Sequence, residues 1–294
     1  NSKQAKGISD EEVARLKSYL AALKEKVKNI DFINFEDYLE ESEIGEGVTS
    51  SVKIVVKKAQ EKFAKKELKE FDHKSFKRFL MEAEILFKLR HPCIIRIYGI
   101  NYGDDEHRPS IYLSLEPNSL ENAINAKILT NEQKNRITVE VVLGMRYIHS
   151  RNFMHRDLKP LNILLSKNLH VRFTDFGLAK EEGLSVSQSK GVGTLRFMAP
   201  EIFEENDDDG IVYTNKVDVY YFGITLIFII CNNYPKFDLK NALIGVTREL
   251  PNTMIGWARE LIIRCLSPSQ DERPSFDAIF GILKSNNYDL FNQK

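Results

Sequence analysis

The chain has 294 residues, of which 43% are hydrophobic and 29% charged, and this is the composition of a globular protein with a large core or two lobes. Lys+Arg and Asp+Glu balance at 42 each, so no net field favours nucleic acid or an anionic membrane. The longest apolar run, residues 224–231, is too short to span a bilayer, which takes about 20 residues, and is expected inside a buried helix.

The three cysteines (Cys93, Cys231 and Cys265) are far apart in sequence, and each has isoleucine or leucine neighbours. An odd number of cysteines in apolar surroundings predicts buried, reduced thiols and not a disulfide framework or a metal site. The chain opens at Asn1 without an initiator methionine or an apolar leader, so we expect a fragment or processed piece of a longer protein. A reduced aqueous compartment, cytoplasmic in location, is the expected environment.

Residues 1–33 are predicted to form an amphipathic helical extension. Ser9 and Glu12 make a capping box, and apolar residues then recur at steps of three and four up to Ile30. Such a stripe is typical of a helix that packs on the body of its own protein. The stripe is also compatible with an interface for a partner helix along residues 13–30, and it is too short to separate the two interpretations.

Residues 34–116 are predicted to be strand-rich with one helix. The alternation of Val52, Ile54 and Val56 indicates a half-buried strand, and a second strand is expected around Phe63 and Ala64. A helical stripe follows over residues 76–89 and ends before a His-Pro pair. Two more strands are expected at residues 94–100 and 111–115, joined by a polar hairpin loop.

Residues 117–294 are predicted to be mostly helical, with short strands at 163–165 and 170–173. The acidic run over residues 204–209 is interpreted as a solvated loop, and a role in binding basic substrates is the less favoured alternative. The fold class is therefore α+β, with a small strand-rich part and a larger helical part.

Two glycines, Gly45 and Gly47, lie between a strand entry and a strand exit. Without side chains they let the backbone approach phosphate groups, although such a hairpin is often only a turn. Lys66 follows in a strand pattern that could direct it inward, and a buried ammonium needs a carboxylate partner. Glu82, on the apolar helix, is the candidate; in isolation both residues would be interpreted as surface charges.

Residues 155–162, HRDLKPLN, crowd polar groups into one short loop before three apolar residues. Asp157 can accept and orient a hydroxyl proton, Lys159 can neutralise charge on a transferring phosphate, and Asn162 offers a neutral oxygen ligand. Asp175 follows the second short strand within TDFG. Asn162 and Asp175 together suit Mg²⁺, which takes few protein ligands and completes its shell with phosphate and water.

In this order and spacing, HRDLKPLN, DFG and the Ala199-Pro200-Glu201 triplet resemble the signature set of eukaryotic-type protein kinase catalytic domains. The resemblance covers residues 35–291. It implies a bilobal fold, with residues 34–116 as N-lobe and hinge and 117–294 as C-lobe. It also implies a signalling phosphotransferase that uses ATP and Mg²⁺ to modify a protein substrate.

The resemblance also implies a role for each matching residue. The catalytic set is Asp157, Lys159, Asn162, Asp175, Lys66 and Glu82, with Asn162 and Asp175 as metal ligands. The nucleotide-binding set is Ile44, Gly45, Gly47, Val52, Ala64, Lys66, Leu113, Ser114, Glu116, Leu164 and Asp175. Asp218 would anchor the catalytic loop, and Arg273 would pair with Glu201 in a structural role.

Lys159 and the Gly193-Thr194 pair resemble serine/threonine kinases, and other segments are similar to their tyrosine-kinase-like branch, with dual specificity still possible. Phosphorylation at Ser187 or Ser189, read by Arg156, is a hypothesis for activation that would make the chain a phosphoprotein. The alternative is that these serines are only polar residues in a loop.

The sequence departs from the family pattern in two places, and neither departure removes a catalytic group. Ser50 replaces the third glycine of the loop, which reduces the expected ATP affinity, and the hinge before Leu120 is one residue short. The main alternative function is a pseudokinase scaffold that binds nucleotide and partners without transfer. A small-molecule kinase is a weaker alternative, because the Ala199-Pro200-Glu201 segment suits a peptide-docking platform.

Overall fold

The computed structural model describes residues 37–46, 49–57, 61–69, 72–103, 107–181, 197–202, 214–234, 250 and 254–291. The chain divides into two compact units, one running to residue 90 and including 95–115, the other formed by 91–94 and the chain from 116 onward. The predicted extension at residues 1–33 lies outside the described part. The domain boundaries drawn from the sequence stay a prediction.

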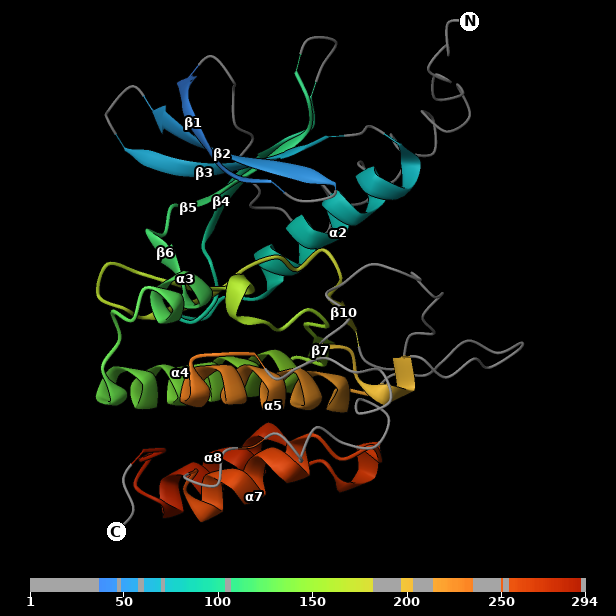
Figure 1. The fold of residues 1–294 in the computed structure, drawn as a ribbon. Coiled ribbons are helices and arrows are strands. Elements are labelled where there is room, and N and C mark those ends of the chain that lie inside the picture. The colour runs from blue at the N-terminus through green and yellow to red at the C-terminus, as the bar shows by residue number, and fades with distance from the viewer. Residues whose placement is uncertain are drawn as a thin grey trace, which may run out of the picture. The chain divides into compact units, whose positions relative to one another are not determined.

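The first unit is an antiparallel sheet with one helix (Figure 1). Its strands pair in the order β1-β2-β3-β5-β4. Their bounds are β1 Tyr38–Glu46, β2 Ser50–Lys57, β3 Lys62–Leu68, β4 Ile97–Asn101 and β5 Ser110–Ser114, and the helix is α2, His73–Lys88. The predicted strands and helix are confirmed here, except that the fourth strand begins at Ile97 and not at Ile94, which forms an isolated bridge in the second unit.

The sheet has two different faces because side chains alternate along each strand. Val55 is fully buried and pairs with Phe63, while Val52, Ile54 and Val56 are only partly buried. The alternation at Val52, Ile54 and Val56 therefore identified the strand but not its most buried residue. Partly or fully buried side chains lie on both faces of β2, which a simple in/out pattern does not predict.

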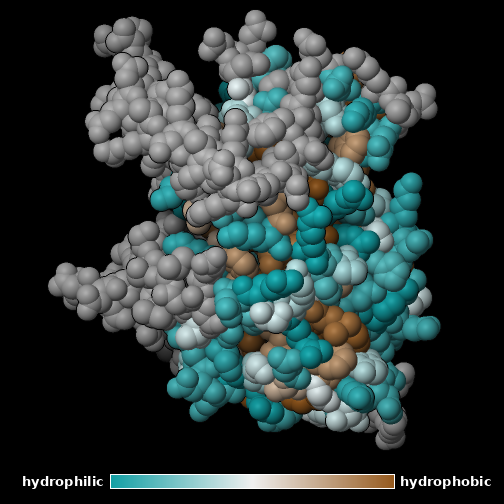
Figure 2. Space-filling view, turned by 180° about the vertical axis from the view of Figure 1, so that it is seen from behind, coloured by the Kyte–Doolittle hydropathy of each residue, from teal (hydrophilic) through white to brown (hydrophobic). Residues whose placement is uncertain are grey.

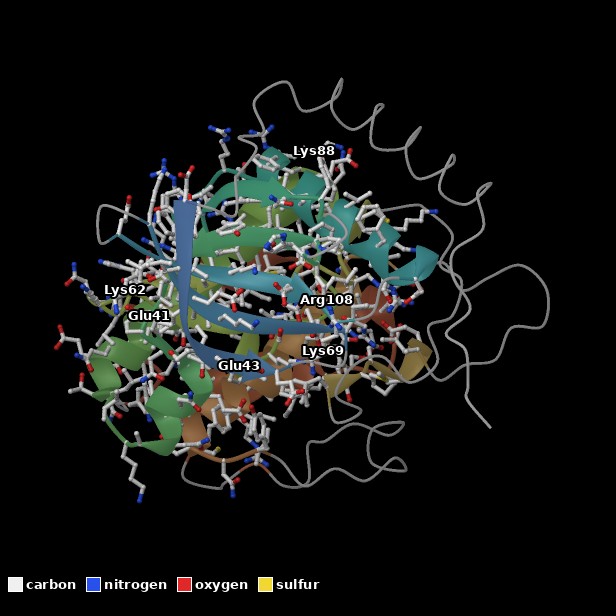
Figure 3. The ribbon with its side chains drawn as sticks, turned by 90° about the horizontal axis from the view of Figure 1, so that it is seen from above. Glu41, Glu43, Lys62, Lys69, Lys88 and Arg108 are labelled. Carbon is white, nitrogen blue, oxygen red and sulfur yellow. The ribbon has the colours of Figure 1, made fainter. Side chains whose placement is uncertain are left out.

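The face that carries Val55 and Phe63 combines an aromatic cluster with a ring of charges. Tyr112 completes the buried cluster, with Tyr38 packed against it at a ring distance of 4.8 Å. A closed ring of four charges lies beside the cluster, with Nζ–O distances of 2.5–3.6 Å, and consists of Glu40, Lys53, Glu67 and Lys65. In Figure 3 the labelled pair Glu41 and Lys62, 2.6 Å apart, lies on this unit as well.

Strand β1 was not foreseen over most of its length. Its sequence, YLEESEIGE, is acidic, and nearly all of its residues are exposed. It pairs with β2 alone and carries two irregularities in register, so it is an edge strand. Charged residues are common on edge strands because they discourage pairing with other chains, and they also hide the strand from a hydrophobic pattern.

The second unit is mainly helical. Its helices are α3 Leu120–Asn125, α4 Asn131–Ser150, α5 Lys216–Cys231, α7 Gly256–Cys265 and α8 Phe276–Ser285, with short 3₁₀ turns at η2 Pro160–Asn162, η4 Pro200–Ile202 and η6 Gln270–Glu272. The short strands are β6 Asn118–Ser119, β7 Phe153–Met154, β8 Ile163–Leu165, β9 Val171–Phe173 and β10 Lys180–Glu181. Helices α4 and α5 contact each other, while α8 packs on α4 and α7 on α5 (Figure 1).

Helix α5 forms the centre of this unit, since every residue from Val217 to Ile229 is buried. The sequence prediction of a buried helix around residues 224–231 is confirmed. Helix α4 begins with a capping box in which Thr130 and Gln133 satisfy each other's backbone N–H groups. Gly144 on α4 lies so close to Phe173 and Cys93 that an added Cβ would overlap with them. Its missing side chain brings α4 against β9.

Hydrophilic residues cover most of the described surface on the face drawn in Figure 2, with an apolar patch in its lower half. No helix in the described ranges is long and apolar enough to cross a membrane. Cys93 and Cys265 are buried free thiols, as predicted, and burial raises the pKa of Cys93 to about 11. The prediction was wrong for Cys231, which is only partly buried because it ends α5.

Candidate active site

Lys66 and Glu82 form an ion pair within the first unit. The Lys66 Nζ atom donates to both carboxylate oxygens of Glu82, at 2.7 and 2.8 Å. The Glu82 side chain is 5% exposed and that of Lys66 is 15% exposed. Each of these buried charges needs the other as its partner, because either charge buried alone would carry a large desolvation cost. The predicted pairing of strand β3 with helix α2 through these residues is present.

Most of the predicted nucleotide-binding residues of this unit share the sheet face of Lys66. Strand register places Gly45 opposite Val52, Val52 opposite Lys66, and Ala64 opposite Leu113. Paired residues of antiparallel strands point to the same face, so these five positions form one surface. Gly47 lies outside the described residues.

Two further predicted residues of this unit have other environments. Ile44 is 49% exposed and falls at the irregularity of β1, so the pairing does not fix its side. The Ser114 N–H donates to the Arg96 carbonyl at 2.8 Å and therefore is not available to a nucleotide.

Asp157, Lys159 and Asn162 meet in the second unit. The Lys159 ammonium donates to both oxygens of Asp157, at 3.1 and 2.9 Å. The Asn162 amide donates to the Asp157 carboxylate at 2.8 Å and to its backbone carbonyl at 2.9 Å. Proline at position 160 starts the 3₁₀ turn η2, which returns Asn162 toward Asp157. The three residues therefore form one polar cluster around a carboxylate.

The pKa of Asp157 lies above its ordinary value. Burial is the main cause, the cation of Lys159 opposes it, and the nearby charge of Asp175 raises the pKa further. A carboxylate that accepts protons more readily than usual is suited to general-base chemistry near neutral pH. Because the charge of Asp175 contributes to this shift, Asp175 is close enough to Asp157 to affect its proton affinity.

Asn162 and Asp175 are supplied by the two strands of one hairpin. Strand β8 follows Asn162, strand β9 precedes Asp175, and the Thr174 N–H donates to the Asn162 carbonyl at 3.0 Å. Asp175 has a φ of +61°, in the left-handed region that few non-glycine residues adopt. Such backbone strain is common at functional sites because the surrounding structure maintains it.

This donor set fits magnesium. Asn162 uses its amide nitrogen toward Asp157, so its side-chain oxygen is the atom left for a cation. No group of three or more His, Cys, Asp or Glu residues in the described ranges could hold a metal ion. Magnesium is commonly held by one or two carboxylates together with phosphate and water oxygens, and it does not require a larger protein cage.

Asp218 on α5 anchors the backbone of the loop that carries Asp157. Its carboxylate accepts the N–H groups of His155 at 2.9 Å and Arg156 at 2.8 Å, and His149 Nε2 lies 2.9 Å from the same group. Burial alone would raise the pKa of Asp218, but His149, the charge of His155 and the Arg156 N–H together hold it below its ordinary value. Arg156 itself has a φ of +64°.

The third partner of Asp218, His149, was missed in the sequence. His149 lies four residues after Met145 and next to Ile148, both fully buried, so it falls on the apolar stripe of α4. A titratable residue on such a stripe signals a buried polar contact. Its ring also packs edge-on against Phe276 at 5.0 Å.

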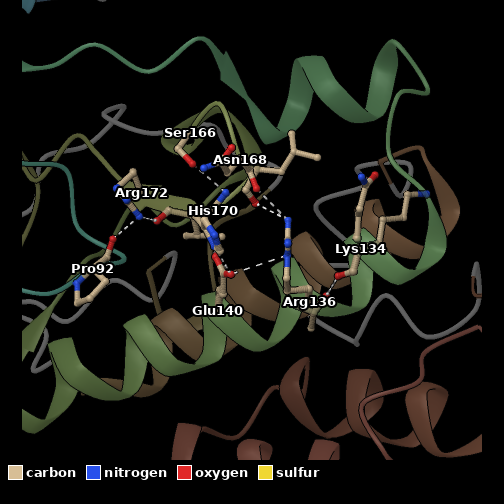
Figure 4. A network of polar contacts seen from close by, with 12 residues as sticks. Pro92, Lys134, Arg136, Glu140, Ser166, Asn168, His170 and Arg172 are labelled. Carbon is tan, nitrogen blue, oxygen red and sulfur yellow. Dashed lines mark hydrogen bonds and ion pairs between the residues drawn. The ribbon is translucent and has the colours of Figure 1, made fainter.

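The far end of the β8–β9 hairpin is fixed to α4, as Figure 4 shows. Glu140 accepts the Val171 N–H at 2.8 Å and contacts His170 Nδ1 at 2.8 Å. Arg136, one helical turn earlier, donates to the Asn168 carbonyl at 3.1 Å, and Arg172 donates to the Pro92 carbonyl. These contacts hold the hairpin whose other end carries Asn162 and Asp175.

A second buried ion pair joins Glu201 and Arg273, as the sequence indicated. Two parallel hydrogen bonds of 2.7 Å connect the guanidinium and the carboxylate, and the Arg273 side chain is fully buried. Arg273 also donates to the Ser267, Pro268 and Lys216 carbonyls. Every N–H group of the Arg273 guanidinium therefore donates a hydrogen bond. Through these bonds the pair links η4 to the start of α5 and to η6.

The remaining predicted residues have less defined environments. Leu164 is partly buried on β8, and the Glu116 carboxylate lies 4.0 Å from the Arg172 guanidinium. The loop serines 187 and 189, Thr194 and the acidic run at 204–209 lie outside the described residues. The phosphorylation hypothesis therefore stays a prediction.

Known proteins match this sequence over most of its length. A profile of the protein kinase domain family matches residues 38–282. RGS domain-containing serine/threonine-protein kinase A of Dictyostelium discoideum is 32% identical over 231 residues, 73% of this chain and 19% of that protein. Mitogen-activated protein kinase kinase kinase 9 of Arabidopsis thaliana is 32% identical over 66% of this chain and 25% of its own length.

A third relative is the dual specificity protein kinase shkA of Dictyostelium discoideum, 31% identical over 74% of this chain and 43% of that protein. The chain spans about a fifth of the length of several of the curated relatives that it matches. The similarity therefore concerns only a part of each of these relatives.

Proposed function

This chain belongs to the protein kinase family, and we propose that it transfers the γ-phosphate of Mg-ATP to serine or threonine hydroxyls of other proteins. The observation that carries the proposal is the state of Asp157, a buried carboxylate of raised pKa within 3.1 Å of Lys159 and Asn162. All of the residue types that phosphoryl transfer requires are present in the chain.

Residues of the first unit are proposed to bind the nucleotide. Gly45 and Gly47 let the backbone approach the phosphates, and Val52, Ala64 and Leu113 supply apolar contacts to the base. The ammonium of Lys66 holds the α/β-phosphates, and its pairing with Glu82 supports this role, because the carboxylate fixes the direction of the ammonium.

Asn162 and Asp175 are proposed to hold magnesium through oxygen atoms. When bound, Mg²⁺ neutralises charge that develops on the phosphate oxygens. Asp157 orients the substrate hydroxyl and accepts its proton, and Lys159 stabilises charge on the transferring group. The contact between Lys159 and Asp157 supports this assignment, since it keeps the cation beside the reacting carboxylate.

The choice of serine and threonine rests on Lys159 in HRDLKPLN and on the Gly193-Thr194 pair. The names of the relatives support this choice, and the name of one of them includes dual specificity. We therefore propose serine and threonine as the main acceptors, with tyrosine as a measurable alternative. A cytosolic location is also proposed, on the reduced thiols Cys93 and Cys265, and subcellular fractionation tests it.

The test is a transfer assay with purified protein, Mg-ATP and a degenerate peptide library that contains serine, threonine and tyrosine. Phosphosites are located by mass spectrometry, and the matched control is Asp175→Asn, which keeps the shape of the side chain but removes its charge. We expect phosphoserine and phosphothreonine with the unmodified protein and none with the variant.

Other results have clear meanings. Phosphotyrosine as the main product would contradict the proposed acceptor class. ATP binding without transfer, also after phosphorylation of the chain by an upstream kinase, would contradict the enzyme and support the scaffold alternative. Equal transfer by the unmodified protein and the Asp175→Asn variant would point to a contaminating kinase.

A further inference from the structure

Two arginines and a histidine lie along one exposed strip of the second unit. Arg136 on α4 is 44% exposed, His170 before β9 is 48% exposed, and Arg172 on β9 is 28% exposed. Figure 4 shows these side chains where the β8–β9 hairpin lies against α4. These three residues, the basic strip, are outside the proposed catalytic and nucleotide-binding sets.

Backbone carbonyl groups hold the two arginines of the basic strip. Arg136 donates to two carbonyls of the hairpin turn, at 3.1 and 3.4 Å, and Arg172 donates to the Pro92 carbonyl. A carbonyl oxygen accepts a hydrogen bond but carries no net charge. These contacts therefore fix the direction of each guanidinium group and leave its positive charge in place, which reduces the conformational entropy that is lost when an anion binds.

Two carboxylates lie beside the arginines but do not form hydrogen bonds with them. Glu140 lies 3.9 Å from Arg136 Nε, while its oxygens contact His170 Nδ1 and a backbone N–H of β9, both at 2.8 Å. Glu116 lies 4.0 Å from Arg172 Nε. Both distances to the arginines exceed the length of a hydrogen bond, and both carboxylates are largely buried. The basic strip therefore presents mainly positive charge to solvent.

Another arginine of α4 has the opposite environment. Two guanidinium nitrogens of Arg146 lie 2.6 and 2.7 Å from one oxygen of Asp277 on α8. Within the described ranges no carboxylate lies this close to Arg136, and exposed Glu132, one turn before it on α4, forms no ion pair with it. The arginines of the basic strip are therefore available to an external carboxylate, whereas Arg146 is already neutralised.

The spacing of the basic strip fits an extended polypeptide. The Ser166 N–H donates to the His170 carbonyl at 2.9 Å, so the hairpin pairing continues to His170. His170 and Arg172 are two residues apart on this paired stretch, and their side chains therefore point to the same face, about 7 Å apart along the strand. Alternate side chains of an extended chain have the same spacing. Acidic residues at alternate positions thus meet successive donors of the strip, and carboxylates form paired hydrogen bonds with guanidinium groups.

We propose that the basic strip is a docking surface for an acidic, extended segment of a partner protein, with aspartate or glutamate at alternate positions. Arg172 and His170 contact successive carboxylates, and Arg136, which lies against the hairpin turn, contacts a third one. Binding at the strip requires neither ATP nor phosphate transfer, so this role goes beyond the proposed function. The partner class is defined by the charge of the segment and by the spacing of its acidic residues.

The test measures the dissociation constants of labelled peptides by fluorescence anisotropy at low salt. The probe is a short peptide in which glutamate and valine alternate. One control peptide carries glutamine in place of glutamate, and a second has the same composition with its glutamates adjacent. The proteins are the unmodified chain, Arg136→Gln, Arg172→Gln, Arg136→Glu and, as the matched control, Arg146→Gln. These peptides contain no hydroxyl group, so a chain without transfer activity gives the same binding result.

We expect the unmodified chain to bind the alternating peptide about tenfold more tightly than the glutamine peptide. Arg136→Gln and Arg172→Gln should each weaken this binding about fivefold, because each removes one charge-assisted contact. Arg136→Glu should weaken it about twentyfold and should bind a lysine–valine peptide better than the unmodified chain does, a gain that unfolding cannot produce. Arg146→Gln should bind within about twofold of the unmodified chain, since Asp277 already neutralises Arg146.

Equal binding of the glutamate and glutamine peptides would overturn the docking role, as would an equal loss of affinity in Arg136→Gln and Arg146→Gln. Equal binding of the alternating peptide and the peptide with adjacent glutamates would overturn the extended geometry. A phosphoserine peptide and a short RNA are tested as competitors. Tighter binding of either one through the same arginines would overturn the assignment to a carboxylate-rich protein segment.

Discussion

The second unit holds two buried aspartates in different electrostatic states. Asp218 accepts two backbone N–H groups and contacts His149, and its pKa is below the ordinary value. Asp157 is buried too, but its neighbours are one cation, one amide and a second carboxylate, and its pKa is above the ordinary value. Asp218 binds the backbone of the loop on which Asp157 lies.

The difference shows how the same type of side chain can provide an anchor in one place and the proposed reactive group in another. Several fixed donors stabilise the ionised form of Asp218 and outweigh its burial. Asp157 has fewer compensating donors, so burial dominates, and its ionised form is less stable and more basic. Removal of charge should therefore affect stability at Asp218 and activity at Asp157.

The largest expected effect is on catalysis. Asp157→Asn should reduce kcat by about 100- to 10,000-fold, because the proposed base is lost. The free energy of unfolding should change by less than about 1 kcal/mol, since folding disfavours the charged form that the variant removes. Steady-state kinetics and urea unfolding measure the two quantities. A stability loss as large as that of Asp218→Asn would contradict the comparison.

Asp218→Asn should reduce the free energy of unfolding by about 3 kcal/mol near neutral pH, because one amide oxygen replaces a carboxylate that satisfies three donors. A pKa lowered by folding means that the stability contribution of Asp218 exists above its unfolded pKa and is lost as pH falls through the folded pKa. The difference in the free energy of unfolding between Asp218→Asn and the unmodified protein should therefore decrease at acidic pH. Urea unfolding across a pH series measures it, and a constant difference would contradict the role of the charge.

Lys159→Met should move the acidic limb of the kcat/KM profile to higher pH. The Lys159 cation lowers the pKa of Asp157, so its removal raises the pKa, and the base becomes protonated at a higher pH. Lys167→Met is the matched control, because Lys167 is exposed on the β8–β9 turn, and its profile should not move. A shift in the opposite direction would show that the acidic limb of the profile does not follow the protonation of Asp157.

The smallest expected effect concerns the charge ring of the first unit. Glu40→Gln should change the free energy of unfolding by only about 0.5 kcal/mol, because Glu40 is 45% exposed and Lys65 keeps its contact with Glu67. Thermal unfolding at low and high salt measures this. A loss above about 1.5 kcal/mol would show that partly exposed charges in this protein contribute as much as buried ones.

Residue order along the chain was enough to predict many of these features. HRDLKPLN, DFG and the Ala199-Pro200-Glu201 triplet indicated the family, a helical stripe located α2, and short apolar runs located β8 and the buried helix α5. The ion pairs Lys66–Glu82 and Glu201–Arg273 were also foreseen, because the family pattern identified both partners of each pair.

The sequence alone thus determined which chemical groups are present and which helices and strands have apolar sides. Only the tertiary structure decided that acidic β1 is a strand and that His149 reaches Asp218. The physical reason is that pairing partners and burial come from residues that are distant in the chain. A local pattern does not contain these neighbours, and they set the pKa of each buried carboxylate.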